Sequence, residues 1–170
     1  MIDSLEDDDP ENLILVDNST NSIIYTHKNE KSSFYRRLLF SDYQWSNDSK
    51  WVIFTHDNIE DVLPVDIYLF DVESKNLSTI SSDITTQNAY LLGWAENYES
   101  FYFKVYEWTQ EVYVFHEYIL SSNLIQELTT TPTYIVDSAS EESLYINSTT
   151  VYGRHSPDDL LFISSMQMDN

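Results

Sequence analysis

Short apolar runs alternate with polar clusters along the chain, and this pattern predicts β-strands. The runs hold three or four residues that are mostly β-branched, leucine or aromatic, which is the composition typical of strands. Polar clusters such as Asp17–Asn21, Ser46–Ser49 and Glu73–Asn76 separate them, as turns separate strands. One stretch, Lys31–Phe40, fits a helical turn but is too short to change the class. We therefore expect an all-β fold, with strands over Leu13–Val16, Ile23–Tyr25, Trp51–Phe54, Ile67–Phe70, Phe101–Phe103, Val112–Phe115 and Leu160–Ile163.

The strand pattern also repeats. Trp45 and Trp94 lie 49 residues apart, and each ends a predicted strand that is followed by a polar turn and a second apolar strand. A fixed period of about 40–50 residues is the mark of a β-propeller. Two four-stranded units are clearest, over residues 41–81 and 89–130, with half a unit before them. Weaker copies of the first hairpin lie at Tyr134–Ile146 and His155–Ile163.

These repeats resemble those of a known family. Trp45–Thr55 followed by Asp66–Asp71 is similar to the repeat of the TolB-type, WD40-like β-propellers, in which a Ser-Pro-Asp-Gly-Lys turn precedes an apolar strand. His155–Asp159 is similar to the same turn, although no copy in this chain has the turn glycine. Related blades occur in the propeller domains of prolyl-oligopeptidase-type peptidases. The resemblance implies antiparallel four-stranded blades and a scaffold that binds other proteins.

The length sets the size of such a propeller. At about 40–45 residues per blade, the chain has room for about three to four blades, so we expect a partial or small propeller, with a β-sandwich as the alternative. We expect one propeller-like domain over residues 11–165, preceded by an acidic tail at 1–10 and followed by a short tail at 166–170.

Net charge restricts the partners. The 29 Asp and Glu against 8 Lys and Arg give a formal net charge of −21. This charge excludes the counterion release by which proteins hold nucleic acid, and it steers the chain towards basic partners. No run approaches the ~18 apolar residues of a membrane span, and the first residues lack the features of a signal peptide. We expect a soluble chain, either cytoplasmic or a mature or excised part of an exported protein.

Motifs for catalysis are missing from the sequence. There is no cysteine, and glycine occurs only at Gly93 and Gly153, so neither a Gly-x-Ser-x-Gly elbow nor a phosphate-binding loop can be written. The histidines form no His-x-x-x-His zinc pair, and we expect them at strand ends or turns. A carboxylate pair for glycoside hydrolysis stays open, because its geometry is three-dimensional. The four histidines are His27, His56, His116 and His155.

Calcium is the one cofactor for which the chain offers ligands at short spacing. Asp7–Asp9 and Asp17–Asn21 supply hard oxygen atoms, but neither segment has the glycine and terminal glutamate of an EF-hand. A solvated tail and an Asx-turn explain these segments better, so we expect no cofactor.

Three tryptophans differ in their expected roles. Trp45 and Trp94 end strands, where a blade packs such rings between sheets, so we expect both in the core. Trp108 lies in Tyr106–Glu111, where a hairpin should turn, and it is flanked by Glu107 and Glu111. An exposed tryptophan between acids is a candidate partner contact. We name Trp108, Glu107 and Glu111 as that contact, with local packing as the alternative for Trp108.

These observations favour a non-enzymatic module that binds a protein or peptide, with a basic partner preferred. One alternative is the propeller part of a larger, prolyl-oligopeptidase-like hydrolase. Another is a carbohydrate-binding β-sandwich, which an exposed row of aromatic residues would favour. Open blade edges also predict self-association.

Overall fold

The fold consists of β-strands only, within the part of the chain that can be described. The computed structural model describes residues 12–28, 38–58, 66–80, 89–134, 142–146 and 149–166, which form thirteen strands and no helix. The all-β prediction is confirmed. The predicted tail at 1–10 and most of Lys31–Phe40 lie outside the described residues. Leu38–Phe40, however, begins a strand, so a helical turn there is wrong.

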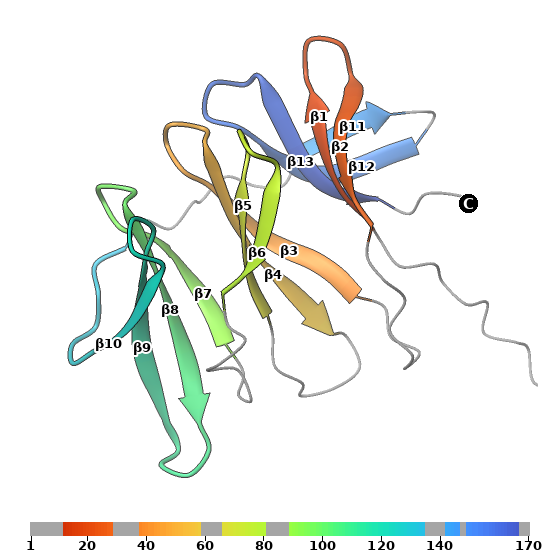
Figure 1. The fold of residues 1–170 in the computed structure, drawn as a ribbon. Coiled ribbons are helices and arrows are strands. Elements are labelled where there is room, and N and C mark those ends of the chain that lie inside the picture. The colour runs from red at the N-terminus through yellow and green to blue at the C-terminus, as the bar shows by residue number, and fades with distance from the viewer. Residues whose placement is uncertain are drawn as a thin grey trace, which may run out of the picture.

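The strands form three antiparallel sheets, which we call A, B and C (Figure 1). Sheets B and C have four strands each, in chain order from one edge to the other, and they occupy the same segments as the two clearest predicted units. Sheet B holds β3 (Leu38–Trp45), β4 (Trp51–Asn58), β5 (Asp66–Asp71) and β6 (Asn76–Thr79). Sheet C holds β7 (Ala89–Trp94), β8 (Ser100–Glu107), β9 (Val112–Ile119) and β10 (Leu124–Leu128).

Sheet A joins the two ends of the described chain. Its order is β11-β12-β13-β1-β2, so the first strand pairs with the last one. The register runs from Asn12 opposite Met166 to Asp17 opposite Leu161. Met166, which we assigned to the C-terminal tail, therefore belongs to a strand. The strands are β1 (Asn12–Asp17), β2 (Ser22–His27), β11 (Glu142–Ile146), β12 (Thr149–His155) and β13 (Leu161–Met166).

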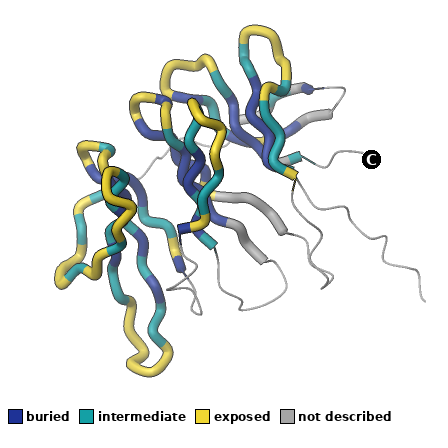
Figure 2. Tube along the Cα trace, in the orientation of Figure 1, coloured by how far each residue is buried: buried dark blue, intermediate teal, exposed yellow. Residues whose placement is uncertain are grey.

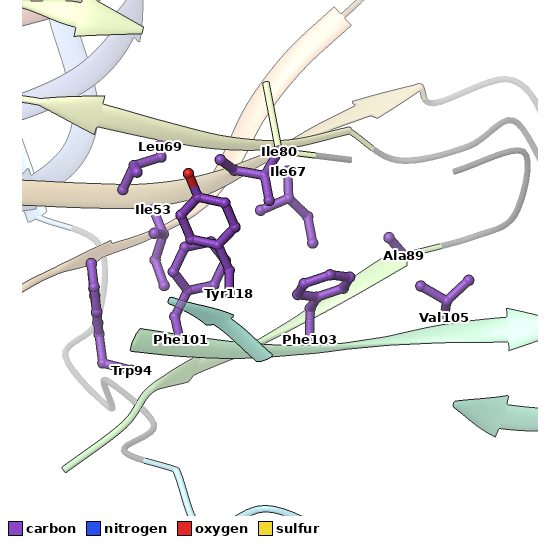
Figure 3. Packing of buried hydrophobic residues seen from close by; sticks show 10 residues of the cluster. All are labelled: Ile53, Ile67, Leu69, Ile80, Ala89, Trp94, Phe101, Phe103, Val105 and Tyr118. Atoms are coloured by element: carbon purple, nitrogen blue, oxygen red, sulfur yellow. The ribbon is translucent and has the colours of Figure 1, made fainter. Parts of the chain in front are cut away.

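The three sheets are arranged as an open fan, with sheet B between A and C (Figure 1). Their cores lie where sheet faces meet. Sheets B and C bury one cluster between them, in which Phe101 and Phe103 of β8 face Ile53 and Ile67 (Figure 3). A second cluster joins sheets A and B through Leu15 and its neighbours. Burial follows the strands, and the turns at the strand ends are exposed (Figure 2).

The turn between β3 and β4 is fixed by its own side chains. Ser46 Oγ donates to Asp48 Oδ1 at 2.7 Å and accepts from the Trp51 amide at 3.0 Å. The Ser46 amide in turn donates to the Trp51 carbonyl at 2.9 Å. Burial raises the pKa of Asp48, but the hydrogen bonds from Ser46 and Lys50 and the Lys50 charge outweigh it, so the pKa lies below its ordinary value.

The turn between β12 and β13 has the same network. Ser156 Oγ donates to Asp158 Oδ1 at 2.5 Å and accepts from the Leu161 amide at 3.0 Å. The β7–β8 turn keeps the backbone bonds but has Ala95 in place of the serine. The predicted copy at His155–Ile163 is therefore a structural repeat of the turn at Ser46.

Three of the turns lack glycine but keep the backbone conformation that glycine favours. Ser49, Tyr98 and Asp159 occupy equivalent positions in the three turns, with φ of 59°, 57° and 58°. These values lie in the left-handed region that glycine adopts without strain. The chain therefore keeps the backbone of the glycine turn with other residues.

Position 153 of β12 requires glycine, because the neighbouring strand lies too close for a side chain. A Cβ at this position would lie 2.0 Å from the carbonyl oxygen of Ile163 on the neighbouring strand. No side chain fits there without moving the backbone of β13.

Candidate functional site

The predicted contact residues lie in the turn between β8 and β9. This hairpin extends beyond the neighbouring strands at one end of the fan, and its tip is exposed (Figures 1 and 2). Trp108 is 56% exposed. The Glu107 carboxylate accepts from Thr109 Oγ1 and from Gln110 Nε2, both at 2.9 Å, which orders the turn. Glu111 closes the turn with φ of 56°.

Trp108 is part of a larger group of rings, which we call the aromatic face: Tyr90, Tyr106, Trp108 and Tyr113, together with Lys104. Neighbouring rings touch, with centroids 4.8 Å apart for Tyr106 and Trp108, and 5.1 Å for Tyr106 and Tyr113. Tyr90 reaches Tyr113 at 5.8 Å. Trp108, Tyr90 and Tyr113 are exposed. Trp108 is therefore exposed and also packs locally, and its role as a partner contact stays a prediction.

Alternation along β8 explains why these rings share a face. Successive side chains of a strand point to opposite sides of the sheet. Phe101, Phe103 and Val105 face sheet B and are buried. Lys104 and Tyr106 therefore point away from sheet B, and cross-strand pairing sets Tyr106 opposite Tyr113.

The aromatic face already holds a cation. Lys104 Nζ lies 4.3 Å from the centroid of the Tyr113 ring and 5.4 Å from that of Tyr90. An ammonium group over aromatic rings is attracted by their quadrupoles. Between residues 89 and 134 the only Lys or Arg is Lys104, against six glutamates, of which Glu107 and Glu111 flank Trp108. The surface therefore favours positive charge.

The other tryptophans of the repeats tie the sheets together. Trp45 and Trp94 are buried, as predicted. The Trp45 Nε1 donates to the Arg154 carbonyl of sheet A at 3.2 Å. The Trp94 Nε1 donates to the Gln44 carbonyl of sheet B at 3.1 Å. Both rings therefore serve the fold and not a ligand.

The histidines do not gather into a site. His27 and His155 end their strands as expected, and the side chain of His56 lies outside the described residues. His116 is different, because it lies within β9 and is buried. Its ring stacks on Phe103, and burial lowers its pKa. The expectation that all four lie at strand ends or turns is therefore wrong for His116.

The candidate calcium ligands divide into two cases. Asp7–Asp9 lie outside the described residues. Asp17 Oδ1 accepts from the Ser19 amide at 2.8 Å and from Ser19 Oγ at 2.6 Å, so this carboxylate forms a turn, and these hydrogen bonds lower its pKa. In the part of the chain that is described, no three His, Asp or Glu side chains gather as metal ligands would. Likewise, no helix of that part is long and apolar enough to cross a membrane.

No family model and no curated protein matches the chain. Among solved structures, TolB from Acinetobacter baumannii is similar, with a TM-score of 0.43 and 13% identity over 91% of this chain. The match covers 38% of TolB, so this chain spans less than half of that protein's length. A likeness of this size does not identify a family.

The sequence indicated the tip of the site but not its extent. Trp108 and its flanking glutamates were found from their place in a predicted turn. Tyr90 and Tyr113 were missed, although the alternation of Phe103, Lys104, Val105 and Tyr106 is a signal that one side of β8 is aromatic and polar. Their proximity depends on strand pairing, which the sequence alone does not show.

Proposed function

We propose that the chain is a non-enzymatic interaction module of the β-propeller type, and that it binds a protein or peptide segment rich in Lys or Arg. The observation that carries the proposal is the aromatic face. Its rings form one continuous, partly exposed surface that already accommodates the ammonium group of Lys104. Clusters of exposed tyrosine and tryptophan are typical of contact surfaces between proteins.

Charge complementarity supports a basic partner. The net charge of −21 attracts basic segments over distances set by ionic strength. Glu107 and Glu111 lie at the edge of the aromatic face, where rim charges raise the association rate more than the affinity. Guanidinium groups are suited to such a surface, because they stack on rings and form paired hydrogen bonds with carboxylates.

The ring geometry disfavours a flat ligand on this face. The interplanar angles are 85° between Tyr106 and Trp108 and 76° between Tyr90 and Tyr113. Rings set edge to face do not form the flat platform that would stack on a sugar chain. The aromatic face therefore supports a basic side chain better than a carbohydrate.

The proposal is tested with a short peptide of alternating Arg and Gly and its citrulline counterpart, which has the same shape without the charge. We expect the Arg peptide to bind by isothermal titration calorimetry and the citrulline peptide to bind much more weakly. Trp108→Ala should weaken binding about tenfold, because one stacked ring contributes roughly 1 kcal/mol or more.

Tyr152→Ala is the matched control. Tyr152 is 63% exposed but lies on sheet A, far from the aromatic face in the fold. Its loss should leave peptide binding unchanged. Equal binding of both peptides, or binding that survives Trp108→Ala, would overturn the proposal. Light scattering of the free chain separately tests the predicted self-association through open edges.

A further inference from the structure

An open cleft of about 660 Å³ lies at the seam between sheets B and C. It is formed where the β3–β4, β7–β8 and β9–β10 turns come together. The Leu120 amide donates to the Glu99 carbonyl at 3.1 Å, which holds the last two turns in place. The volume is in the range of small-molecule sites, roughly 300–1,000 Å³. This cleft is separate from the aromatic face, which lies on the other side of sheet C.

Two aromatic side chains line the cleft from different sheets. Trp51 begins β4, and Tyr98 lies in the β7–β8 turn. Both are half-buried, and both pack against the core between sheets B and C. The Tyr98 ring also contacts Trp94, with centroids 6.2 Å apart. Their orientation is therefore set by the core, which leaves preformed apolar surface in the cleft.

Two further lining residues offer neutral hydrogen-bonding groups. The side chains of Asn47 and Ser121 are exposed and line the cleft, whereas both ends of the Asn97 amide are already hydrogen-bonded to Glu99. Amides and hydroxyls supply both donors and acceptors. A ligand with several hydroxyl groups, each able to donate and accept, matches such a mixed set.

The carboxylates of the cleft are already engaged. Asp48 Oδ2 lies 3.1 Å from Lys50 Nζ, so its charge is paired within the chain. Glu99 Oε2 accepts from Asn97 Nδ2 at 3.2 Å. An organic cation would have to compete with Lys50 for Asp48, and an anion would meet two carboxylates. The carboxylates therefore disfavour an anionic ligand, and their oxygens are good acceptors for hydroxyl groups.

We propose that this cleft binds a neutral saccharide. The apolar C–H face of a pyranose ring packs against Trp51 and Tyr98, and its hydroxyls exchange hydrogen bonds with Asn47 and Ser121. The apolar rings supply binding surface, and the polar groups fix orientation. This site is independent of the basic partner proposed for the aromatic face.

Saturation-transfer NMR with maltose, cellobiose and N,N′-diacetylchitobiose tests the proposal on the intact chain. We expect at least one of them to bind. Replacing Asn47 and Ser121 together by alanine should weaken that binding about tenfold, because two hydrogen bonds are lost. Both residues are exposed, so the double variant should fold. Ser122→Ala is the matched control, because Ser122 is in the same turn but does not line the cleft.

Three results would overturn the proposal. One is the absence of a signal from every sugar. Another is competition by arginine amide for the same variant-sensitive site, which would make the cleft a cation site. The third is loss of sugar binding in Trp108→Ala with retention in the Asn47 and Ser121 variant, which would place the sugar on the aromatic face. The Arg-peptide titration with Trp108→Ala tests the aromatic face separately. Either proposal can therefore be overturned without the other.

Discussion

Individual residues in this chain hold backbone conformations that usually belong to glycine. Within the described residues, eight residues other than glycine have positive φ, and most of them close a turn between two strands. For L-residues this region costs about 1–2 kcal/mol unless asparagine or aspartate relieves it. Backbone hydrogen bonds help to hold this conformation, as in the bonds from the Ser49 and Tyr98 amides to the Ser46 and Ala95 carbonyls. Replacing one of these residues, other than asparagine or aspartate, by glycine should therefore raise stability.

Glu111→Gly is the cleanest such substitution. Glu111 is exposed, has φ of 56° and closes the β8–β9 turn. We expect glycine to raise the free energy of unfolding by about 0.5–1 kcal/mol, since relief of strain exceeds the added freedom of the unfolded chain. Urea unfolding monitored by circular dichroism measures the change. Glu111→Asn should give a smaller gain and Glu111→Val a loss. A glycine variant less stable than the parent would contradict this account.

His116 makes stability depend on pH. The ring is buried against Phe103, and within the described residues its Nδ1 has no hydrogen-bond partner. Burial lowers its pKa below the ordinary value of 6.5, and the opposing effect of Glu127 across the strand pair is smaller. The unfolded chain therefore binds this proton more readily than the folded chain. Stability from this residue is present above pH 6.5 and is lost as the pH falls below it.

The prediction for His116 is a weaker pH dependence on replacement by phenylalanine. His116→Phe keeps a ring stacked on Phe103 but cannot be protonated. Between pH 7 and pH 5 the parent chain should lose more stability than this variant, as measured by urea unfolding at each pH. The carboxylates of the described residues with lowered pKa, Asp17, Asp48 and Asp158, act below their ordinary value of 3.8 and do not interfere in this range. Parallel curves for both proteins would refute the assignment.

A turn fixed by serine and aspartate recurs between β3 and β4 and between β12 and β13. Ser156 is buried, and its hydroxyl makes two hydrogen bonds that hold the β12–β13 turn closed. Ser156→Ala should lower the free energy of unfolding by about 1–2 kcal/mol, because both partners lose a hydrogen bond. Thermal unfolding followed by circular dichroism measures the loss.

Ser74→Ala, in a different turn, is the control for Ser156→Ala. Ser74 lies in the β5–β6 turn, where its backbone amide and not its hydroxyl bonds to Asp71. Its replacement should change stability by less than about 0.5 kcal/mol. Equal losses in both variants would mean that the serine hydroxyl does not matter to the turn.

The apolar runs predicted most of the strands because a half-buried strand must carry large apolar residues. They did not include β3, β6, β7, β10, β11 or β12. The repeat pattern, and not the runs, placed β3, β6, β7 and β10 in the two four-stranded units. Nor did the runs indicate that the half unit at Leu13–Ile23 completes the sheet that contains Leu160–Ile163. Pairing between β1 and β13 depends on the whole fold, and no local signal specifies it. The cleft was missed for the same reason, since Trp51 and Tyr98 meet only through packing of two sheets.

For the whole molecule, the pairing of β1 with β13 links the two ends of the described chain. β1 lies between β13 and β2, and its residues from Leu13 to Val16 are buried on both faces of sheet A. Leu13 and Leu15 belong to the core shared with sheet B, and Ile14 and Val16 to a separate core of sheet A. Sheet B therefore receives part of its core from the N-terminal strand. Loss of that strand's packing should therefore also destabilise sheet B.

Leu15→Ala tests this coupling. The truncation should cost about 2–5 kcal/mol, as buried leucines do. Trp51 and Trp94 contribute to the core between sheets B and C, whereas Trp45 packs in the cluster that contains Leu15. Fluorescence is therefore measured in a Trp45→Phe background, where it reports on sheets B and C. If the sheets form one cooperative unit, fluorescence and circular dichroism will give the same lowered urea midpoint. Ile24→Ala, at a partly exposed position of β2, should shift it less. A fluorescence midpoint that stays at the parent value while circular dichroism shifts would show that sheet A unfolds separately from the rest of the fan.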